Sequence, residues 1–232
     1  MSEEWAVDLN ADLGEEVTDD AGLLAVVTSA NVTCGYHAGS PAIMREVCEQ
    51  AAVRGVAVGA QVSYADRENF GRVELDVPVE TLRDQVAHQV GLLAEIAAAA
   101  GTRVTYVKPH GALYHRVAVD HGQADAVLAG SGELPVLGLP GSVILDLARG
   151  AGRAVRHEGF PDRTYTAEGR LAPRDQPDAV LTDTDRIVRQ ALDLARAVDS
   201  LCLHGDTPGA VAHAAEVRRR LEAAGFHLRR PW

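Results

Sequence analysis

The chain has 232 residues, a length that an α/β barrel fills as a single domain, and 47% of its residues are apolar. Lysine and arginine number 22 against 33 aspartate and glutamate, and the net charge of −11 disfavours nucleic acid and anionic lipid as partners. The opening MSEEWAVDLN lacks a signal sequence, and no apolar run reaches the ~18 to 20 residues of a membrane helix, so we expect a cytoplasmic protein.

Short strand patterns recur along the chain, and each precedes a stretch with helical periodicity. The first helix is expected to begin near Asp19, the next runs from Ser40 and Pro41 to Gly55, and a longer one runs from Pro78 to Gly101. The longer helix carries an apolar stripe of Leu82, Val86, Val90, Leu93 and Ala97. The seven strands are expected within residues 5–14, 29–39, 55–64, 104–114, 134–142, 154–165 and 200–209.

Alternation of strands and helices predicts a parallel sheet, either open and doubly wound or closed into a barrel. Polar residues cluster at the carboxyl ends of nearly all the strands, where ligands bind in both architectures. A closed ring brings the first and last of these ends together. We therefore predict one distorted, TIM-like (β/α) barrel of seven units over residues 1–232.

The first strand places Asp8, Asn10 and Asp12 at alternate positions, so all three side chains face one side. Gly14 and Glu15 follow this strand. An acidic strand end of this kind is suited to holding a metal ion, acting as a general base, or capping the next helix.

Three histidines also follow strands: His37, His110, and His204 with its neighbour Asp206. Their convergence on one rim would indicate acid–base chemistry or a metal site. No HExxH or Cys/His zinc spacing is present, so a metal would need ligands from different strands.

Cys34, Cys48 and Cys202 are too few and too scattered for a disulfide framework, which fits a reducing compartment. Cys34 and Cys202 lie near the histidines, but buried packing is the more common role of a free cysteine than nucleophilic attack. GxSxG is absent, which argues against a serine mechanism of the α/β-hydrolase type.

The stretch YVKPHGALYH places Lys108 and His110 on the same face of a strand, and Pro109 holds the lysine in an extended conformation. A lysine in the mouth of a barrel needs an acidic partner. One interpretation is a Lys–Asp pair that only braces the barrel. The other is a cation that stabilises negative charge on the substrate, beside a histidine that moves protons.

Two loops, residues 64–72 and 160–174, mix aspartate, arginine and an aromatic residue. Arg67, Arg72, Arg163 and Arg174 offer planar groups for a carboxylate or phosphate, although solvated Asp–Arg pairs are common in such loops. No GxxxxGK[ST] occurs, so any nucleotide would be held without a P-loop.

The stretches VDLNADLGE, SANVTCGYHAG, DRENFGR, VKPHGALY, FPDRTY and LCLHGD, in this order, closely resemble the LamB/YcsF family. The resemblance implies a deformed barrel related to those of glycoside hydrolases and deacetylases. It also implies an ATP-hydrolysing 5-oxoprolinase that opens 5-oxo-L-proline (pyroglutamate) to L-glutamate together with 5-oxoprolinase subunits B and C. ATP would be the cosubstrate, and a divalent metal is left open.

Within the site that the resemblance implies, residue type suggests the individual roles. Asp12 or a histidine would be the base, Lys108 would stabilise the oxyanion or phosphate, and Arg67 or Arg163 would bind the substrate carboxylate. The expected catalytic residues are Asp12, His37, Lys108, His110, His204 and Asp206. The expected substrate-binding residues are Asn10, Gln61, Arg67, Arg72, Tyr114 and Arg163.

The chain departs from the family pattern where GAHPSYPD is usual and GAQVSYAD stands here, so Gln61 replaces a histidine and Val62 and Ala65 replace prolines. Asp178 replaces a glycine. Since glutamine cannot shuttle protons near neutral pH, two other functions stay open. One is a metal-dependent amidase or deacetylase with an ion between Asp12 and the histidines, and the other is a non-catalytic partner subunit that binds a carboxylate.

Overall fold

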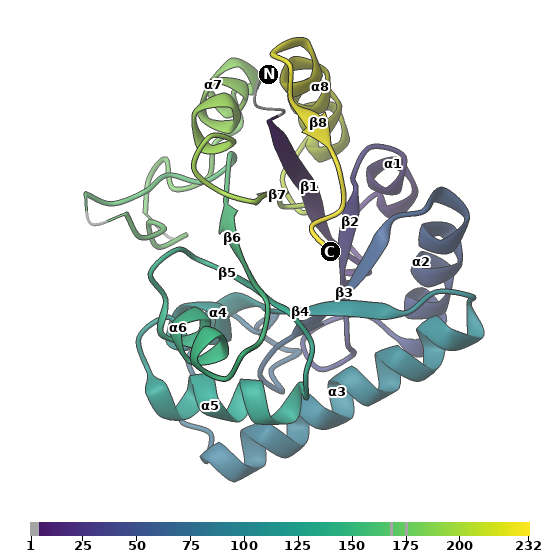
Figure 1. Cartoon of the computed structure of the whole chain (residues 1–232), viewed down its shortest axis with the longest axis vertical. Helices are drawn as coiled ribbons and strands as arrows, with labels where there is room; N and C mark the ends of the chain where they lie inside the picture. The colour runs from purple at the N-terminus through teal and green to yellow at the C-terminus, as the bar shows by residue number, and fades with distance from the viewer. Residues whose placement is uncertain (1–4, 168, 175) are drawn as a thin grey trace.

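The computed structural model describes residues 5–167, 169–174 and 176–232. Figure 1 looks along a ring of strands that is surrounded by helices. The strands are β1 (Ala6–Leu13), β2 (Ser29–Thr33), β3 (Ala57–Val62), β4 (Val104–Pro109), β5 (Val136–Gly138), β6 (Val155–Gly159), β7 (Ser200–Leu203) and β8 (His227–Leu228). The helices are α1 (Asp20–Leu24), α2 (Pro41–Arg54), α3 (Val79–Ala99), α4 (Gly111–Arg116), α5 (His121–Gly130), α6 (Val143–Gly150), α7 (Thr184–Leu194) and α8 (Ala210–Ala223).

The strands β1 to β7 form a closed parallel barrel. Each strand pairs with the next in sequence, and β1 pairs with both β2 and β7, which closes the ring. Asp12 lies opposite Asn31 in β2, and Asn10 lies opposite Cys202 in β7. The prediction of seven strands in a barrel is therefore confirmed, whereas the short β8, which pairs with the beginning of β1, was not predicted.

The predicted helix signals are present in α2 and α3. The Ser40 side chain accepts a hydrogen bond at the start of α2, and Gly55 ends that helix in the left-handed conformation that glycine adopts without strain. Four residues of the predicted stripe on α3 are buried, but Val90 is only half-buried. Gln89 is buried beside it, because its side chain exchanges hydrogen bonds with both backbone groups of Ser63.

Polar side chains fill the amino-terminal part of the barrel interior. The Asp8 carboxylate accepts hydrogen bonds from the hydroxyls of Thr28 (2.6 Å), Ser29 (2.7 Å) and Ser200. The ring of Tyr106 crosses the interior above Gly59, where an added Cβ atom would lie 2.2 Å from the ring. This packing closes the interior below the carboxyl ends of the strands.

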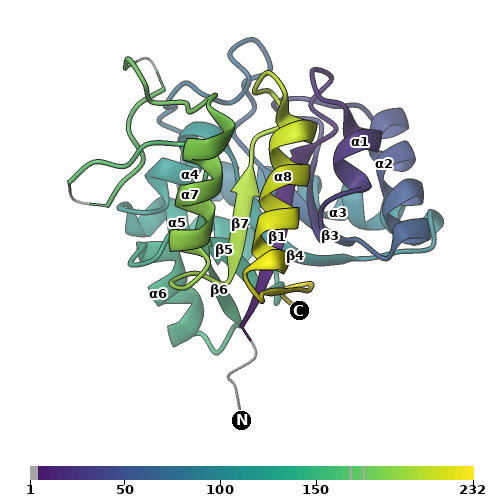
Figure 2. The same ribbon diagram turned by 90° about the horizontal axis from the view of Figure 1, so that it is seen from above.

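The connection from β6 to α7, which includes residues 160–167, 169–174 and 176–183, differs from the expected pattern. No helix is found in its described residues, and the predicted strand followed directly by a helix is wrong for this unit. Two antiparallel bridges, Arg163 with Val180 and Tyr165 with Leu171, organise the connection. Figure 2 shows it at the end of the barrel where β1 and β7 also end.

Two helices, α4 and α5, follow β4, and α4 begins directly after His110. Among the described residues, no helix is both long and apolar enough to cross a bilayer.

Candidate active site

A cavity of about 440 Å³ opens at the carboxyl ends of the strands. It is bordered by the ends of β1, β4 and β7 and by the β6–α7 connection, as the fold predicts for a parallel barrel. The residues that line it are Asp12, Arg72, Lys108, Pro109, His110, Gly111, Ala112, Tyr114, His115, Phe160, Arg163, Leu171, Pro173, Arg174 and His204.

Lys108 lies on the floor of this cavity and contacts two acidic side chains. Its Nζ atom is 3.0 Å from Asp12 Oδ1 and 3.0 Å from Glu158 Oε1, and it donates to Cys202 Sγ at 3.1 Å. The ammonium also lies 5.4 Å from the ring centroid of Phe160. Side chains from β1, β6 and β7 therefore meet Lys108 of β4, which is only 2% exposed.

The charges in this cluster follow from burial and proximity. Burial disfavours the Lys108 cation, but the Asp12 carboxylate keeps the pKa of Lys108 well above its usual value. Burial would likewise raise the pKa of Asp12, and the Lys108 ammonium instead holds it below its usual range. For Glu158 burial outweighs the lysine, and its pKa is raised. Lys108 and Asp12 thus stabilise each other's charged forms.

Neutral side chains hold both carboxyl groups in place. Asn31 donates to Asp12 at 2.8 Å. Glu158 accepts from the Asn10 amide at 3.0 Å and from the Tyr114 hydroxyl at 3.1 Å. Asn10, which was expected to bind substrate, therefore lies below the cavity and supports Glu158.

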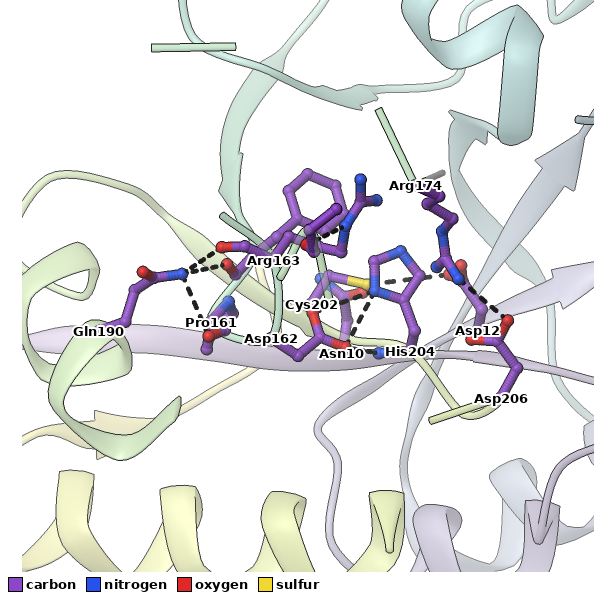
Figure 3. A network of polar contacts seen from close by, with 12 residues as sticks. Asn10, Asp12, Pro161, Asp162, Arg163, Arg174, Gln190, Cys202, His204 and Asp206 are labelled. Atoms are coloured by element: carbon purple, nitrogen blue, oxygen red, sulfur yellow. Dashed lines mark hydrogen bonds and ion pairs between the residues drawn. The ribbon is translucent and has the colours of Figure 1, made fainter. Parts of the chain in front are cut away.

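His204 is oriented by Asp162 in the β6–α7 connection (Figure 3). Its Nδ1 atom lies 3.0 Å from both carboxylate oxygens, and its backbone N–H donates to Oδ2 at 2.8 Å. The imidazole stacks on Phe160 with the ring centroids 5.4 Å apart. Because the carboxylate can only accept, Nδ1–H donates to it, and in the neutral imidazole this leaves the lone pair on Nε2. His204 is therefore arranged as a proton acceptor.

Two arginines at the rim share one acidic partner. Asp206 Oδ2 accepts from Arg72 at 2.5 Å and from Arg174 at 3.1 Å, and Figure 3 shows the Arg174–Asp206 contact beside His204. Since both arginines line the cavity and are bridged by a single carboxylate, the rim retains positive charge.

Arg163 and Arg67, which come from similar loops, occupy different environments. Arg163 is buried, lines the cavity, and donates to the carbonyls of Ala172 (2.5 Å) and Ala179 (3.1 Å). Arg67 lies outside the cavity and pairs at 2.5 Å with the exposed Glu16.

A second buried group lies behind His110. His110 Nε2 is 3.5 Å from Glu15 Oε1, the same oxygen accepts from Gln61 at 3.1 Å, and the His37 ring stacks on His110 with a centroid separation of 4.2 Å. Burial raises the pKa of Glu15 to about 8 and lowers that of His37 to about 4. The pKa of His110 is also lowered well below its usual value by burial.

In the part of the chain that the structure describes, the candidate metal ligands that come together are Glu15, His37 and His110. This grouping differs from the expected ion between Asp12 and the histidines, because Asp12 is bound to Lys108 and His204 to Asp162. Gln61 lies beside this grouping and outside the cavity.

The cysteines behave as packing residues. Cys34, Cys48 and Cys202 are buried free thiols. Burial raises the pKa of Cys202 well above its usual value despite the neighbouring Lys108, which disfavours a thiolate nucleophile.

Most of the expected site residues meet at the cavity. Asp12, Lys108, His110 and His204 line it as expected, as do Arg72, Tyr114 and Arg163. Asp206 binds the rim arginines, and His37 packs behind His110. Sequence reasoning missed Glu158 and did not single out Asp162. The only signal for Glu158 was an acidic residue inside a strand pattern, two positions before Phe160.

A parallel barrel with an acid–base cavity at the carboxyl ends of its strands is typical of enzymes that act on small molecules. The model of the LamB/YcsF family matches residues 7–231, and the chain belongs to this family. A relative from Streptomyces avermitilis, the A subunit of 5-oxoprolinase, is 57% identical over 96% of this chain and 98% of its own length.

Two solved structures share the fold. The lactam utilization protein from Thermus thermophilus has a TM-score of 0.89 and 37% identity, over 97% of this chain and 99% of its own. The peptidoglycan deacetylase PdaC from Bacillus subtilis has a TM-score of 0.53 and 14% identity, over 97% of this chain and 87% of its own. The second likeness shows the fold alone, and it agrees with the predicted relation to deacetylase barrels.

Proposed function

We propose that this chain is the A subunit of an ATP-dependent 5-oxoprolinase, which opens 5-oxo-L-proline to L-glutamate together with subunits B and C. The observation that carries the proposal is the cavity of about 440 Å³ with an oriented base, a buried cation and a cationic rim, in a relative of the 5-oxoprolinase A subunit. A lactam of this size fits within the cavity, and its carboxylate matches the charge of the rim.

The chemistry explains why ATP is needed. A lactam is a stabilised amide, and phosphorylation of its carbonyl oxygen turns it into a better electrophile. Water then adds to the carbonyl carbon and the C–N bond breaks as the ring nitrogen takes up a proton, which leaves an acyl phosphate. A second water cleaves this acyl phosphate to the carboxylate and releases phosphate. The net change is one 5-oxo-L-proline, one ATP and two waters consumed for one glutamate, one ADP and one phosphate.

His204 is the best-placed base for the attacking water. Asp162 fixes its tautomer and stabilises the imidazolium that forms when the proton is transferred. Asp12 is a poorer base, because the Lys108 ammonium keeps it ionised and lowers its proton affinity. The histidine alternative is therefore favoured over the aspartate.

Lys108 stabilises the negative charge that develops on the substrate. Its ammonium is held by carboxyl groups on two different strands, so it needs little reorganisation when charge appears on the former carbonyl oxygen or its phosphate. At the rim, Arg72 and Arg174 would bind the substrate carboxylate.

The test is reconstitution of the chain with subunits B and C and measurement of ATP-coupled glutamate formation. We expect glutamate and ADP in equal amounts, and none when this chain is omitted. A complete complex that forms no glutamate would reject the function. The His204→Gln variant distinguishes a catalytic role of this chain from a merely regulatory one. Only a catalytic role predicts that the variant loses turnover while it still assembles with subunits B and C.

A further inference from the structure

The group behind His110 has an unusual lack of hydrogen bonds. Both ring nitrogens of His37, Nδ1 of His110 and Oε1 of Gln61 are buried and have no hydrogen-bond partner among the described residues. Buried polar atoms are rarely left without a partner, because each one has lost its water. Four such atoms in one place require an explanation.

Packing rather than hydrogen bonding fixes these rings. The His37 ring stacks on His110 at 4.2 Å with an interplanar angle of 20°, and Phe70 packs its edge against both, with centroids at 5.9 Å and 5.6 Å. The rings are thus held in a defined orientation while their nitrogens stay available.

The acidic member of the group forms no ion pair with a lysine or arginine in the described structure. Glu15 is 3% exposed, and its carboxyl group contacts the Gln61 amide at 3.1 Å and His110 Nε2 at 3.5 Å. A buried carboxylate with only these partners would be stabilised by a cation.

The donor atoms are close enough for one ion. One ligand atom from each of Glu15, His37 and His110 lies within 4.8 Å of the others. Ligands at about 2.1 Å from a tetrahedral zinc ion lie roughly 3.4 Å apart, so a closure of at most about 1.4 Å would complete the site. Two imidazoles and a carboxylate suit zinc and neighbouring first-row ions better than magnesium or calcium.

We propose that Glu15, His37 and His110 bind one divalent first-row metal ion, with the Gln61 carbonyl oxygen as a weak fourth ligand. The site has no residue in common with the Lys108 cluster and shares with the cavity only His110, which borders both. An ion bound there would supply positive charge beside the cavity. The inference does not depend on the substrate.

The test uses the full chain without an affinity tag and Co²⁺ as the probe. After removal of bound metal, we expect one equivalent of Co²⁺ with a visible absorption band typical of a site with nitrogen ligands, and a raised melting temperature. Zn²⁺ should displace the cobalt and abolish the band. A chain that binds no stoichiometric Co²⁺ would overturn the inference.

A matched pair of variants locates the site. Glu15→Gln preserves shape and removes one charge, and we expect it to weaken Co²⁺ binding by about 100-fold. Glu16→Gln removes the same charge one residue further on, at an exposed position paired with Arg67, and should change binding by less than about twofold. Equal binding by the two variants would contradict the site.

Gln61→His provides a second variant if Glu15→Gln does not fold. An imidazole is a better ligand for these ions than an amide oxygen, so Co²⁺ binding should tighten by about tenfold. Unchanged binding would overturn the assignment of Gln61 and of the site around it. None of these measurements needs lactam or ATP. Metal binding without glutamate formation would reject only the proposed function. Glutamate formation without metal binding would reject only the metal site.

Discussion

Glu158 and Lys108 form an ion-pair contact of 3.0 Å inside the barrel, although they lie far apart in the chain and their strands, β6 and β4, are not neighbours in the ring. The contact places a carboxyl group opposite Asp12 and leaves the ammonium between two acids. It makes Lys108 both a structural and a chemical element of the site.

Replacement of Lys108 by methionine should therefore destabilise the fold and remove activity. The substitution leaves two buried carboxyl groups without their cation, and we expect a loss of about 3–5 kcal/mol in the free energy of unfolding. Urea denaturation measures this loss. Adding Glu158→Gln should restore part of the stability but no glutamate formation, whereas an unchanged urea midpoint for Lys108→Met alone would contradict the role of the cluster.

Asp162→Asn should reduce turnover without loss of folding. An amide in place of the carboxylate no longer fixes Nδ1–H of His204 or stabilises the imidazolium, and we expect kcat to fall by about 10²-fold or more. The control is Asp199→Asn. Asp199 accepts from the backbone N–H of His157 at 2.8 Å in a similar Asp–His pair outside the cavity. Similar kinetics for the two variants would show that the Asp162 pair has no special part in the reaction.

Arg72→Gln should weaken substrate binding more than it slows the reaction. Loss of a charge-assisted hydrogen bond to the lactam carboxylate is expected to raise KM by about 10- to 100-fold. Arg67→Gln, outside the cavity, removes an arginine from the same loop and should change KM by less than about twofold. A KM that rises equally in both variants would mean that the loop, and not the guanidinium in the cavity, is responsible.

Asp8 gives the protein a specific dependence of stability on pH. Burial raises the pKa of Asp8 to about 6 in the folded state, against about 3.8 when unfolded, so the folded chain binds the proton more tightly. This contribution is fully present below about pH 4 and is lost as the pH rises through about 6.

Asp8→Asn removes that titration, and the stability difference between variant and wild type should shift in favour of the variant by up to ~3 kcal/mol from pH 4 to pH 7. Urea denaturation at several pH values checks the sign. A difference that stays constant with pH would mean that Asp8 does not titrate in this range.

The sequence predicted the barrel well, because nearly all the strands end in a recognisable polar stretch and α2 begins and ends at the expected capping residues. It predicted convergence of Asp12, Lys108 and His204 for the same reason: the carboxyl ends of parallel strands in a ring must meet. The side-chain contacts depend on register and tilt, which local patterns do not specify.

Two pairs of residues illustrate that limit. Arg67 and Arg163 come from loops of similar composition, yet Arg67 pairs with Glu16 outside the cavity and Arg163 is buried at its wall. His37 and His204 both follow strands, but only His204 reaches the cavity, because its loop faces Asp162. Only the spatial arrangement of the neighbouring loops separates these cases.

The buried thiols can be used to find out where the protein begins to unfold. Cys202 lies in β7 against β1, where the first and last strands of the ring join, whereas Cys48 lies in α2 on the outer layer. An alkylating reagent reaches each sulfur only after its surroundings separate. The order in which the two are labelled would therefore reveal whether the chain begins to unravel at the seam of the ring or by release of a peripheral helix.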